Sequence, residues 1–393
     1  MFEAFLPYQP ESAQLLSQQL SAHVFPQSVL LSGDRYTGRM SIALEIARVL
    51  SCAEDARNTC QCASCKDFSV YGMSNVVALG NRNHATRIEA AIAMVKERKD
   101  ENSYLMLIRT VRIMLLQFHG ALFASQETKS SALFESAASV NDVLIEFEEA
   151  ASAAQRKQLL DRLEAALKPL APHVKRSSPL TISQVRSLQD WIMQTSFRDN
   201  VRCIIFEGVE ESTEGARNSL LKLLEEPPKQ TYIIVISENP ARLLPTILSR
   251  LQRHQVRPLM KEATNRLIAE FFDSHSLSYT SLEHCILSKA GIPCEEITKQ
   301  AQKIIESLCT MTSLASLELD SIIEIIDEPA RLEYFLRQFQ QGVREQFLLG
   351  KISYHAAHSF IQFASEAAHK AGIFNQNRRL LVESLYYRLQ EVV

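Results

Sequence analysis

Apolar and polar positions alternate with two different periods along the first two thirds of the chain. Residues 28–33 form a short apolar run that ends in glycine, and residues 40–50 then repeat apolar side chains at the spacing of an α-helix. Similar strand-like runs lie at 76–79, 203–206 and 232–236, and helix-like segments at 182–193 and 216–224. Strands that alternate with helices are typical of a parallel sheet covered on both faces. The pattern therefore predicts one α/β domain that extends to about Pro258.

Beyond Pro258 the pattern changes, because no convincing strand follows. The remaining segments are helix-compatible and lie at 261–273, 282–289, 295–308 and 330–393. We divide this part into a small helical piece, 259–302, and a helical bundle, 303–393. The last third of the chain is thus predicted to be all-α.

Residues 84–175 interrupt the α/β pattern with a long segment rich in Ala, Glu, Leu, Lys and Arg at helical spacing. The segment ends in breaks that contain Pro169, Pro172 and Pro179. This pattern predicts a helical insertion, and the sequence does not indicate what the insertion contacts. Its basic cluster at 96–99 is more typical of a solvated helix face than of a DNA contact.

The composition narrows the class of protein. A chain of 393 residues suits two or three domains, and its 46% hydrophobic and 22% charged residues are ordinary for globular proteins. The net charge of −3 provides no whole-chain attraction to nucleic acid or to an anionic membrane. The N-terminus lacks the pattern of a secretory signal, and the longest apolar stretch, 104–123, is interrupted by Arg109, Arg112 and His119. We therefore expect a cytoplasmic protein without a membrane span.

Residues 33–40 have the strand, loop and helix setting and the glycine spacing of a P-loop, whose amides and helix N-terminus surround a phosphate. A working loop places Lys on the phosphates and a Ser or Thr hydroxyl on Mg²⁺, whereas this chain has Arg39 and Met40. Arg is forked rather than compact, and a thioether is a poor ligand for a hard cation. The spacing of Gly33 and Gly38 also suits an ordinary strand-to-helix turn. The sequence leaves open whether the altered loop still holds a nucleotide.

The candidate acidic site is altered as well. The run 203–206 is followed by Glu207 and Gly208, where a nucleotide hydrolase of this class has two acidic residues, one for Mg²⁺ and one for the attacking water. Glu207 either binds a cation through water or is a polar strand end. Gly208 has no side chain that positions anything. Two independent losses at one site predict that the chain does not hydrolyse ATP.

Four of the eight cysteines lie in one short segment: Cys52, Cys60, Cys62 and Cys65. In a cytoplasmic chain such a cluster indicates a metal rather than disulfides, and four thiolates complete the tetrahedral shell of a structural Zn²⁺. The gaps of seven, one and two residues are tight, and the gap between Cys60 and Cys62 makes a standard knuckle awkward. A distorted or metal-free loop is the alternative. The other four cysteines are scattered in apolar surroundings, and we interpret them as core residues.

The most specific stretch is Asn-Ser-Leu-Leu-Lys-Leu-Leu-Glu-Glu-Pro-Pro at 218–228, followed by Pro-Thr-Ile-Leu-Ser-Arg at 245–250. Together with the glycine loop and the segment 182–186, these residues closely resemble the AAA+ module of bacterial clamp-loader subunits. Among these, the altered P-loop resembles the delta-prime type of DNA polymerase III. The resemblance covers nearly the whole α/β part except 84–175.

The resemblance implies a domain organisation. It comprises an AAA+ P-loop domain (1–258) with a zinc module (52–65) and a helical insertion (84–175), a small helical lid domain (259–302), and an all-α collar domain (303–393) for oligomerisation. The zinc module of the family directly follows the P-loop helix, and the cysteines here have that place. The family's cysteines are usually spaced by about eight, two and two residues, wider than in this chain.

The resemblance also implies a role and partners. In the family, an arginine of a Ser-Arg-Cys motif reaches into the ATP site of the neighbouring subunit, and the matching residues here are Ser249, Arg250 and Leu251. Arg250 is therefore the expected trans arginine finger, because a guanidinium presents several donors to a phosphate. A surface salt bridge is the ordinary alternative. The implied partners are loader subunits of the tau/gamma and delta types, the sliding clamp and primer-template DNA, in a hetero-oligomer.

Two other functions fit parts of the sequence. An active loader ATPase similar to the tau/gamma subunit is disfavoured by Arg39, Met40 and Gly208, and residues 291–293 lack the basic sensor of such motors. A stand-alone zinc protein that binds DNA is disfavoured by the net negative charge.

Overall fold

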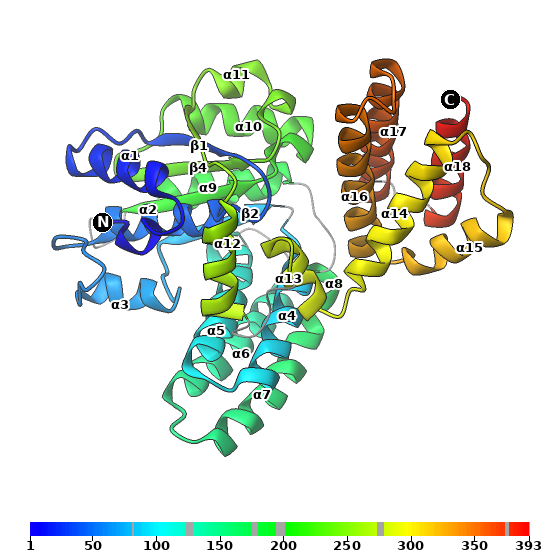
Figure 1. Ribbon diagram of the computed structural model, residues 1–393. Helices are drawn as coiled ribbons and strands as arrows, with labels where there is room; N and C mark the ends of the chain where they lie inside the picture. The colour runs from blue at the N-terminus through cyan, green and yellow to red at the C-terminus, as the bar shows by residue number, and fades with distance from the viewer. Residues whose placement is uncertain are drawn as a thin grey trace. The chain divides into compact units, whose positions relative to one another are not determined.

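The computed structural model describes residues 1–80, 82–122, 129–174, 180–193, 201–272, 279–373 and 377–392. The chain forms two compact units, Met1–Lys289 and Ala290–Val393. The first unit contains the sheet, and the described elements of the second are all helices (Figure 1).

A five-stranded parallel sheet in the order β2-β3-β4-β1-β5 is the centre of the first unit. The inner strands are apolar almost throughout, because helices cover both of their faces. The predicted parallel α/β domain is confirmed. The strands are β1 (Ser28–Ser32), β2 (Val76–Gly80), β3 (Arg202–Glu207), β4 (Thr231–Ser237) and β5 (Gln252–Gln255).

Successive residues of each strand point to opposite faces and so fill two separate cores. On β1, Leu31 belongs to the core under α1 and α2, whereas Leu30 belongs to the core under α9 and α10. These helices are α1 (Pro10–Ser21), α2 (Arg39–Ser51), α9 (Ile182–Met193) and α10 (Glu214–Glu225).

The sequence pattern misses β5, which consists of Gln-Arg-His-Gln. Only His254 of this strand is buried. β5 lies at the edge of the sheet and pairs with β1 alone, so most of its side chains face water rather than a helix. A polar run can therefore form this strand without any apolar signal.

The segment between β2 and β3 is a helical subdomain with its own core, in which Leu107 and Phe147 are fully buried. Capping boxes at Asp100 and Ser152 begin two of its helices. Figure 1 shows α5, α6 and α7 side by side in cyan and green. The helices are α4 (His84–Arg98), α5 (Glu101–Leu115), α6 (Lys129–Glu149), α7 (Ala153–Leu167) and α8 (Ala171–Val174).

Of the described helices, one segment is long and apolar enough to cross a membrane by length and composition alone: Glu101–Leu122. Half of its apolar window is buried inside the protein. Its Arg112 is buried too and forms a 2.5 Å salt bridge with Glu148 on α6. The segment thus supplies core positions of the helical insertion.

The insertion also contacts the helices that follow the sheet. α4 packs against α13 (Leu282–Lys289), where Glu97 binds Lys289 with an Oε–Nζ distance of 2.5 Å. Lys96 and Arg98, from the predicted basic cluster, pair with acidic residues of the same unit. The solvated face stays a prediction, because these pairings do not test a contact with DNA.

The described elements after β5 are all helices, as predicted. In the first unit these are α12 (Lys261–Leu267), a π-helical turn (Ile268–Phe272) and α13; the second unit contains α14 (Cys294–Cys309), α15 (Ser316–Ile325), α16 (Pro329–Leu348), α17 (Tyr354–Ile373) and α18 (Arg378–Gln390). The compact units divide between Lys289 and Ala290. The functional boundaries at 258 and 302 stay predictions.

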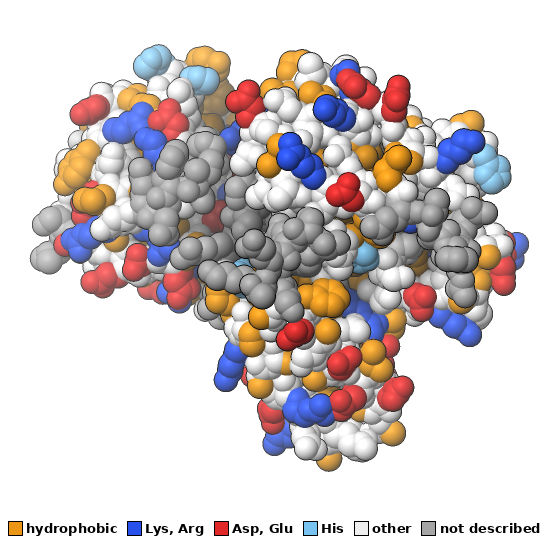
Figure 2. All heavy atoms as spheres, turned by 180° about the vertical axis from the view of Figure 1, so that it is seen from behind, with side chains coloured by type: hydrophobic (Ala, Val, Ile, Leu, Met, Phe, Trp, Pro, Cys, Tyr) orange, Lys and Arg blue, Asp and Glu red, His pale blue; other side chains and the backbone are white. Residues whose placement is uncertain are grey.

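Charged side chains of both signs are interspersed on the surface. On the face shown in Figure 2, Lys and Arg lie among Asp and Glu over the described residues, without a broad field of one sign. This mixture agrees with the net charge of −3.

Candidate functional site at the carboxyl edge of the sheet

The glycine loop joins β1 to α2, and its two glycines are needed for different reasons. Gly38 is the N-cap residue of α2 with a φ of 89°, and a Cβ there would meet no described atom within 4 Å. Gly33 has a φ of 151°, and a Cβ there would lie 2.2 Å from the carbonyl oxygen of Val256. Only glycine permits this approach. The close packing of the chain after β5 therefore accounts for Gly33 without a phosphate.

The side chains at the two altered P-loop positions are buried. Arg39 and Met40 are each 5% exposed. Arg39 Nη2 lies 3.4 Å from Glu238 Oε1, and Arg35 Nε lies 2.5 Å from the same oxygen. Arg39 Nη1 is buried without a hydrogen-bond partner among the described residues. Met40, in the first turn of α2, packs in the core between this helix and the sheet. The position of a working lysine is thus occupied by one half of an internal ion pair.

The candidate acidic residue is also paired. Glu207 ends β3, and both of its carboxylate oxygens lie 3.3 Å from Arg82 Nη1. Gly208 follows with a φ of 74°. The next carboxylate, Glu210, accepts a 2.9 Å hydrogen bond from Ser237 Oγ, and burial raises its pKa. Glu207 is therefore held by an arginine rather than free for Mg²⁺, and no side chain at position 208 orients a water.

Another arginine approaches this edge from α4. The guanidinium of Arg87 lies 4.5 Å from the centroid of the Tyr36 ring. Burial, with the charge of Arg82 nearby, lowers the pKa of Arg87 to about 10, so the side chain stays charged at neutral pH. The edge therefore combines the guanidinium groups of Arg35, Arg39, Arg82 and Arg87 with the carboxylates of Glu207 and Glu238.

This arrangement can hold the loop in place, and it differs from a phosphoryl-transfer site at positions 39, 40 and 208. Residues 33–40 offer no lysine and no hydroxyl at the required positions, and 208 offers no second carboxylate. Sequence reasoning missed Arg82, Glu238 and Arg87. The first two follow the ends of β2 and β4, and carboxyl ends of parallel strands meet at one edge, so their positions carried a usable signal. The position of Arg87 on α4 carried none.

Arg250 lies at the surface, after the short helix α11 (Pro245–Leu248). Its Nη2 is 2.5 Å from Glu225 Oε1 at the end of α10, and its Nη1 donates a 2.7 Å hydrogen bond to the carbonyl oxygen of Thr246. Ser249 Oγ also donates to the Thr246 carbonyl oxygen, at 3.1 Å. The Arg250 side chain is 32% exposed. A finger role therefore requires Arg250 to exchange a carboxylate of its own chain for a phosphate.

The four clustered cysteines converge in space. Their Sγ atoms all lie within 4.8 Å of one another, with 3.6 Å from Cys52 to Cys60 and 3.9 Å from Cys52 to Cys62. Four sulfurs at about 2.3 Å from one Zn²⁺ would be separated by about 3.8 Å. The cluster thus fits a tetrahedral zinc, and the single residue between Cys60 and Cys62 does not prevent the convergence.

The local structure favours the thiolate form at Cys62, one of the four cysteines. α3 (Ala63–Ser69) begins after Cys62, whose Sγ accepts a 3.4 Å hydrogen bond from the Cys65 backbone N–H. This bond is the main reason that the pKa of Cys62 falls to about 7. Of the four other cysteines, Cys203, Cys285 and Cys294 are buried and Cys309 is half-buried.

The fold and the loop define a class: a parallel α/β protein with a glycine loop between its first strand and the helix that follows. The family model described as DNA polymerase III, delta subunit, matches residues 8–260. This match covers more than half of the chain, so the chain belongs to that family.

Relatives agree with this assignment over shorter segments. DNA polymerase III subunit delta' of Bacillus subtilis is 37% identical over 106 residues, 26% of this chain and 32% of the relative. The delta' subunit of Pseudomonas aeruginosa is 42% identical over 72 residues, 18% and 22% of the two chains. DNA polymerase III subunit gamma/tau of Mycobacterium tuberculosis is 26% identical over 110 residues, 28% and 19%. The chain thus spans a third or less of the length of these relatives.

A solved structure also aligns along the chain. It is a DNA polymerase III gamma subunit-related protein of Thermotoga maritima, which covers 96% of this chain and 98% of its own at 14% identity. Its TM-score of 0.39 is too low to carry an argument.

Proposed function

We propose that this chain is a non-hydrolysing clamp-loader subunit of DNA polymerase III, which helps to load the sliding clamp onto primed DNA in the cytoplasm. Family membership supports the assignment to this machine. Its partners are loader subunits of the tau/gamma and delta types in a hetero-oligomer, with the clamp and primer-template DNA contacted through the complex. In this proposal the helices after β5 provide the lid and the collar.

The observation that carries the proposal is the state of the nucleotide edge. Arg39, which would meet phosphate, is paired with Glu238, and Glu207, which would meet Mg²⁺, is paired with Arg82, so each of these charges has a partner within the chain. Phosphoryl transfer depends almost wholly on positioning and charge. An AAA+ module in this state has a structural role and contributes chemistry only through another subunit.

That contribution is a guanidinium supplied in trans by Arg250, beside Ser249. Arg250 is surface-exposed, and its ion pair with Glu225 is of the kind worth about 0–1 kcal/mol. An arginine finger accelerates hydrolysis by about 10³–10⁵. The ion pair with Glu225 is therefore only a small barrier to exchange for a neighbour's γ-phosphate once the subunits assemble.

The test is a reconstituted loader with the cognate partner subunits. Arg250→Ala is expected to leave assembly intact and to lower DNA-stimulated ATP hydrolysis at the adjacent subunit. Arg253→Ala, which removes an exposed arginine three residues further along, is the matched control and keeps the wild-type rate. An unchanged rate with Arg250→Ala removes the finger assignment.

The alternative function is an active ATPase similar to the tau/gamma subunit, a type that also occurs among the relatives. The purified chain without partners distinguishes the two functions. We expect no hydrolysis above background. Turnover at the rate of a motor subunit, lost in Arg39→Ala, would support the alternative instead.

The four clustered cysteines hold a structural zinc in this proposal. Zinc with four thiolates has no open position, so it supplies folding energy to the loop after α2 and no catalysis. Metal analysis of the purified chain should find one zinc per chain. Absence of bound zinc would leave the metal-free loop as the correct reading.

A further inference from the structure

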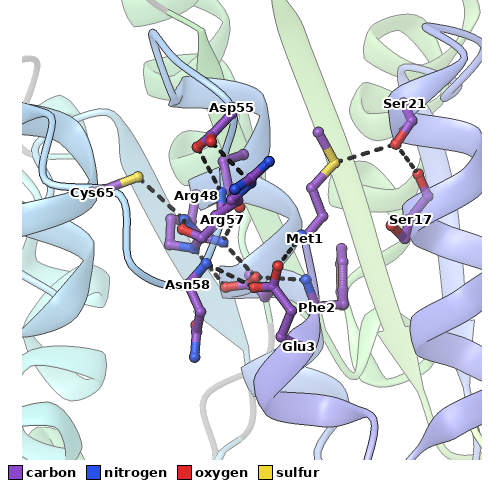
Figure 3. A network of polar contacts seen from close by, with 12 residues as sticks. Met1, Phe2, Glu3, Ser17, Ser21, Arg48, Asp55, Arg57, Asn58 and Cys65 are labelled. Carbon is purple, nitrogen blue, oxygen red and sulfur yellow. Dashed lines mark hydrogen bonds and ion pairs between the residues drawn. The ribbon is translucent and has the colours of Figure 1, made fainter.

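Arg48 on α2 is a buried arginine that the nucleotide edge does not use. It lies in the last turn of α2, away from the glycine loop, and is 8% exposed. Its guanidinium group points at the cysteine loop (Figure 3). Its Nη1 lies 3.2 Å from Cys65 Sγ, and its Nε and Nη2 each lie 2.7 Å from a carboxylate oxygen of Glu45.

All five N–H donors of this guanidinium have acceptors. The two bonds that complete the set go to the carbonyl oxygens of Ala56, at 2.8 Å, and Arg57, at 3.4 Å. An arginine has five donors in a fixed fork, so the acceptors determine its orientation. One donor is thereby directed at a sulfur of the cluster rather than at water.

We propose that Arg48 is a positioning residue of the metal-bound cysteine cluster. The inference rests on the zinc assigned above and not on the loader role. Zn²⁺ with four thiolates carries a net charge of −2, which is costly to bury unless a cation or hydrogen bonds compensate. Arg48 donates such a hydrogen bond to Cys65, the one buried thiol of the four, while its own charge is paired with Glu45. Groups in this outer position orient metal ligands and tune the metal.

The other cationic residues near the cysteine cluster are poorer hydrogen-bond partners for its sulfur atoms. Arg57 is 72% exposed, so water competes for the donors of its guanidinium group. Lys66 is exposed on α3. Arg48 is the buried guanidinium in contact with the cluster among the described residues.

The same network joins the cluster to the N-terminus. Glu45, which fixes Arg48, accepts a 3.3 Å hydrogen bond from the backbone N–H of Phe2. Glu3 accepts a 2.7 Å bond from the backbone N–H of Asn58 in the cysteine loop (Figure 3). Arg48 and Glu45 thus link the cysteine cluster, through α2, to the first residues of the chain.

The test uses the full-length chain and three variants, loaded with Zn²⁺ or with Co²⁺ as a spectroscopic probe. Arg48→Met removes the charge and the donors but keeps an apolar stem, Arg48→Lys keeps the charge without the fork, and Arg57→Met is the exposed control. Chelator competition should give about 10–100-fold weaker zinc binding for Arg48→Met, the range found for such outer partners. We expect a smaller loss for Arg48→Lys and none for Arg57→Met.

The Co²⁺ spectrum separates this role from a purely structural one. An N–H···S bond lowers the energy of the sulfur lone pairs, so its loss should move the thiolate-to-cobalt charge-transfer band to lower energy. If Arg48→Met does not fold, Glu45→Gln, which loosens the guanidinium, should show the same band shift and weaker binding. Wild-type affinity and spectrum in the folded variant overturn the proposal. A wild-type chain that binds neither metal overturns the zinc assignment itself.

Discussion

The pairing of Arg250 with Glu225 allows a quantitative prediction about the proposed finger. Glu225→Gln keeps the size of the side chain and removes the charge that competes with a neighbour's phosphate for Arg250. The hydrogen bond from Arg250 to Thr246 remains, so the arginine keeps one of its two anchors. The substitution should therefore release the guanidinium without displacing its backbone.

The magnitude follows from the exposure of the pair. The Arg250 and Glu225 side chains are 32% and 48% exposed, and an ion pair so exposed is worth at most about 1 kcal/mol. About 1.4 kcal/mol corresponds to a tenfold change in an equilibrium, so 1 kcal/mol corresponds to about fivefold. Release of Arg250 should thus raise ATP hydrolysis by the neighbouring subunit no more than about fivefold. The free energy of unfolding of the isolated chain should fall by less than about 1 kcal/mol.

Two measurements check this prediction. Steady-state ATP hydrolysis of the reconstituted loader, without DNA and with primed DNA, reports the finger; urea unfolding of the isolated chain reports the stability. Glu226→Gln removes an equal charge from the adjacent exposed residue and serves as the control.

A fall in hydrolysis with Glu225→Gln as deep as that with Arg250→Ala would refute the reasoning. It would mean that Glu225 orients the finger rather than competing with the phosphate. A stability loss of several kcal/mol would refute the treatment of the pair as a surface interaction.

Further predictions concern the fold and its stability. Gly33→Ala should cost several kcal/mol in urea unfolding, because the added Cβ would lie 2.2 Å from a backbone carbonyl, whereas Gly38→Ala, with open space but a positive φ, should cost about 1–2 kcal/mol. Leu220→Ala, at a fully buried position of α10, should cost about 2–5 kcal/mol, and the exposed Lys222→Ala less than about 0.5 kcal/mol. Burial holds the pKa of His84 well below its usual 6.5, so the unfolded chain takes up a proton there before the folded chain does. Stability should therefore fall as the pH drops below about 6.5, by up to about 1.4 kcal/mol per pH unit from this group, and His84→Gln should flatten that part of the profile in unfolding measurements between pH 7 and 5.

The local hydrophobic pattern was sufficient to predict the buried strands, but it did not predict the edge strand β5. β1 and β4 are apolar because both of their faces meet helices, and this requirement is visible in the sequence. β5 satisfies its backbone hydrogen bonds with β1 and buries only His254, so nothing in Gln-Arg-His-Gln distinguishes it from a loop.

The residues of the candidate sites could likewise be predicted only where they lie close together in the sequence. The glycines of the loop and the clustered cysteines lie close together in sequence, so their spacing alone indicated them. The ion pairs Arg39–Glu238 and Arg82–Glu207 join residues 199 and 125 positions apart, and only the sheet order brings these together. The pairing of Arg250 with Glu225 could not be predicted either, because nothing in the sequence around the two residues indicates that they are in contact.

Helix α4 connects the carboxyl edge of the sheet to the last helix of the first unit. It begins at His84, two residues after the arginine that holds Glu207, and near its other end Glu97 binds Lys289. A helix of 15 residues is about 22 Å long and does not bend easily. α4 therefore joins the end of the sheet, where Arg82 holds Glu207, to α13, the last helix of the first unit.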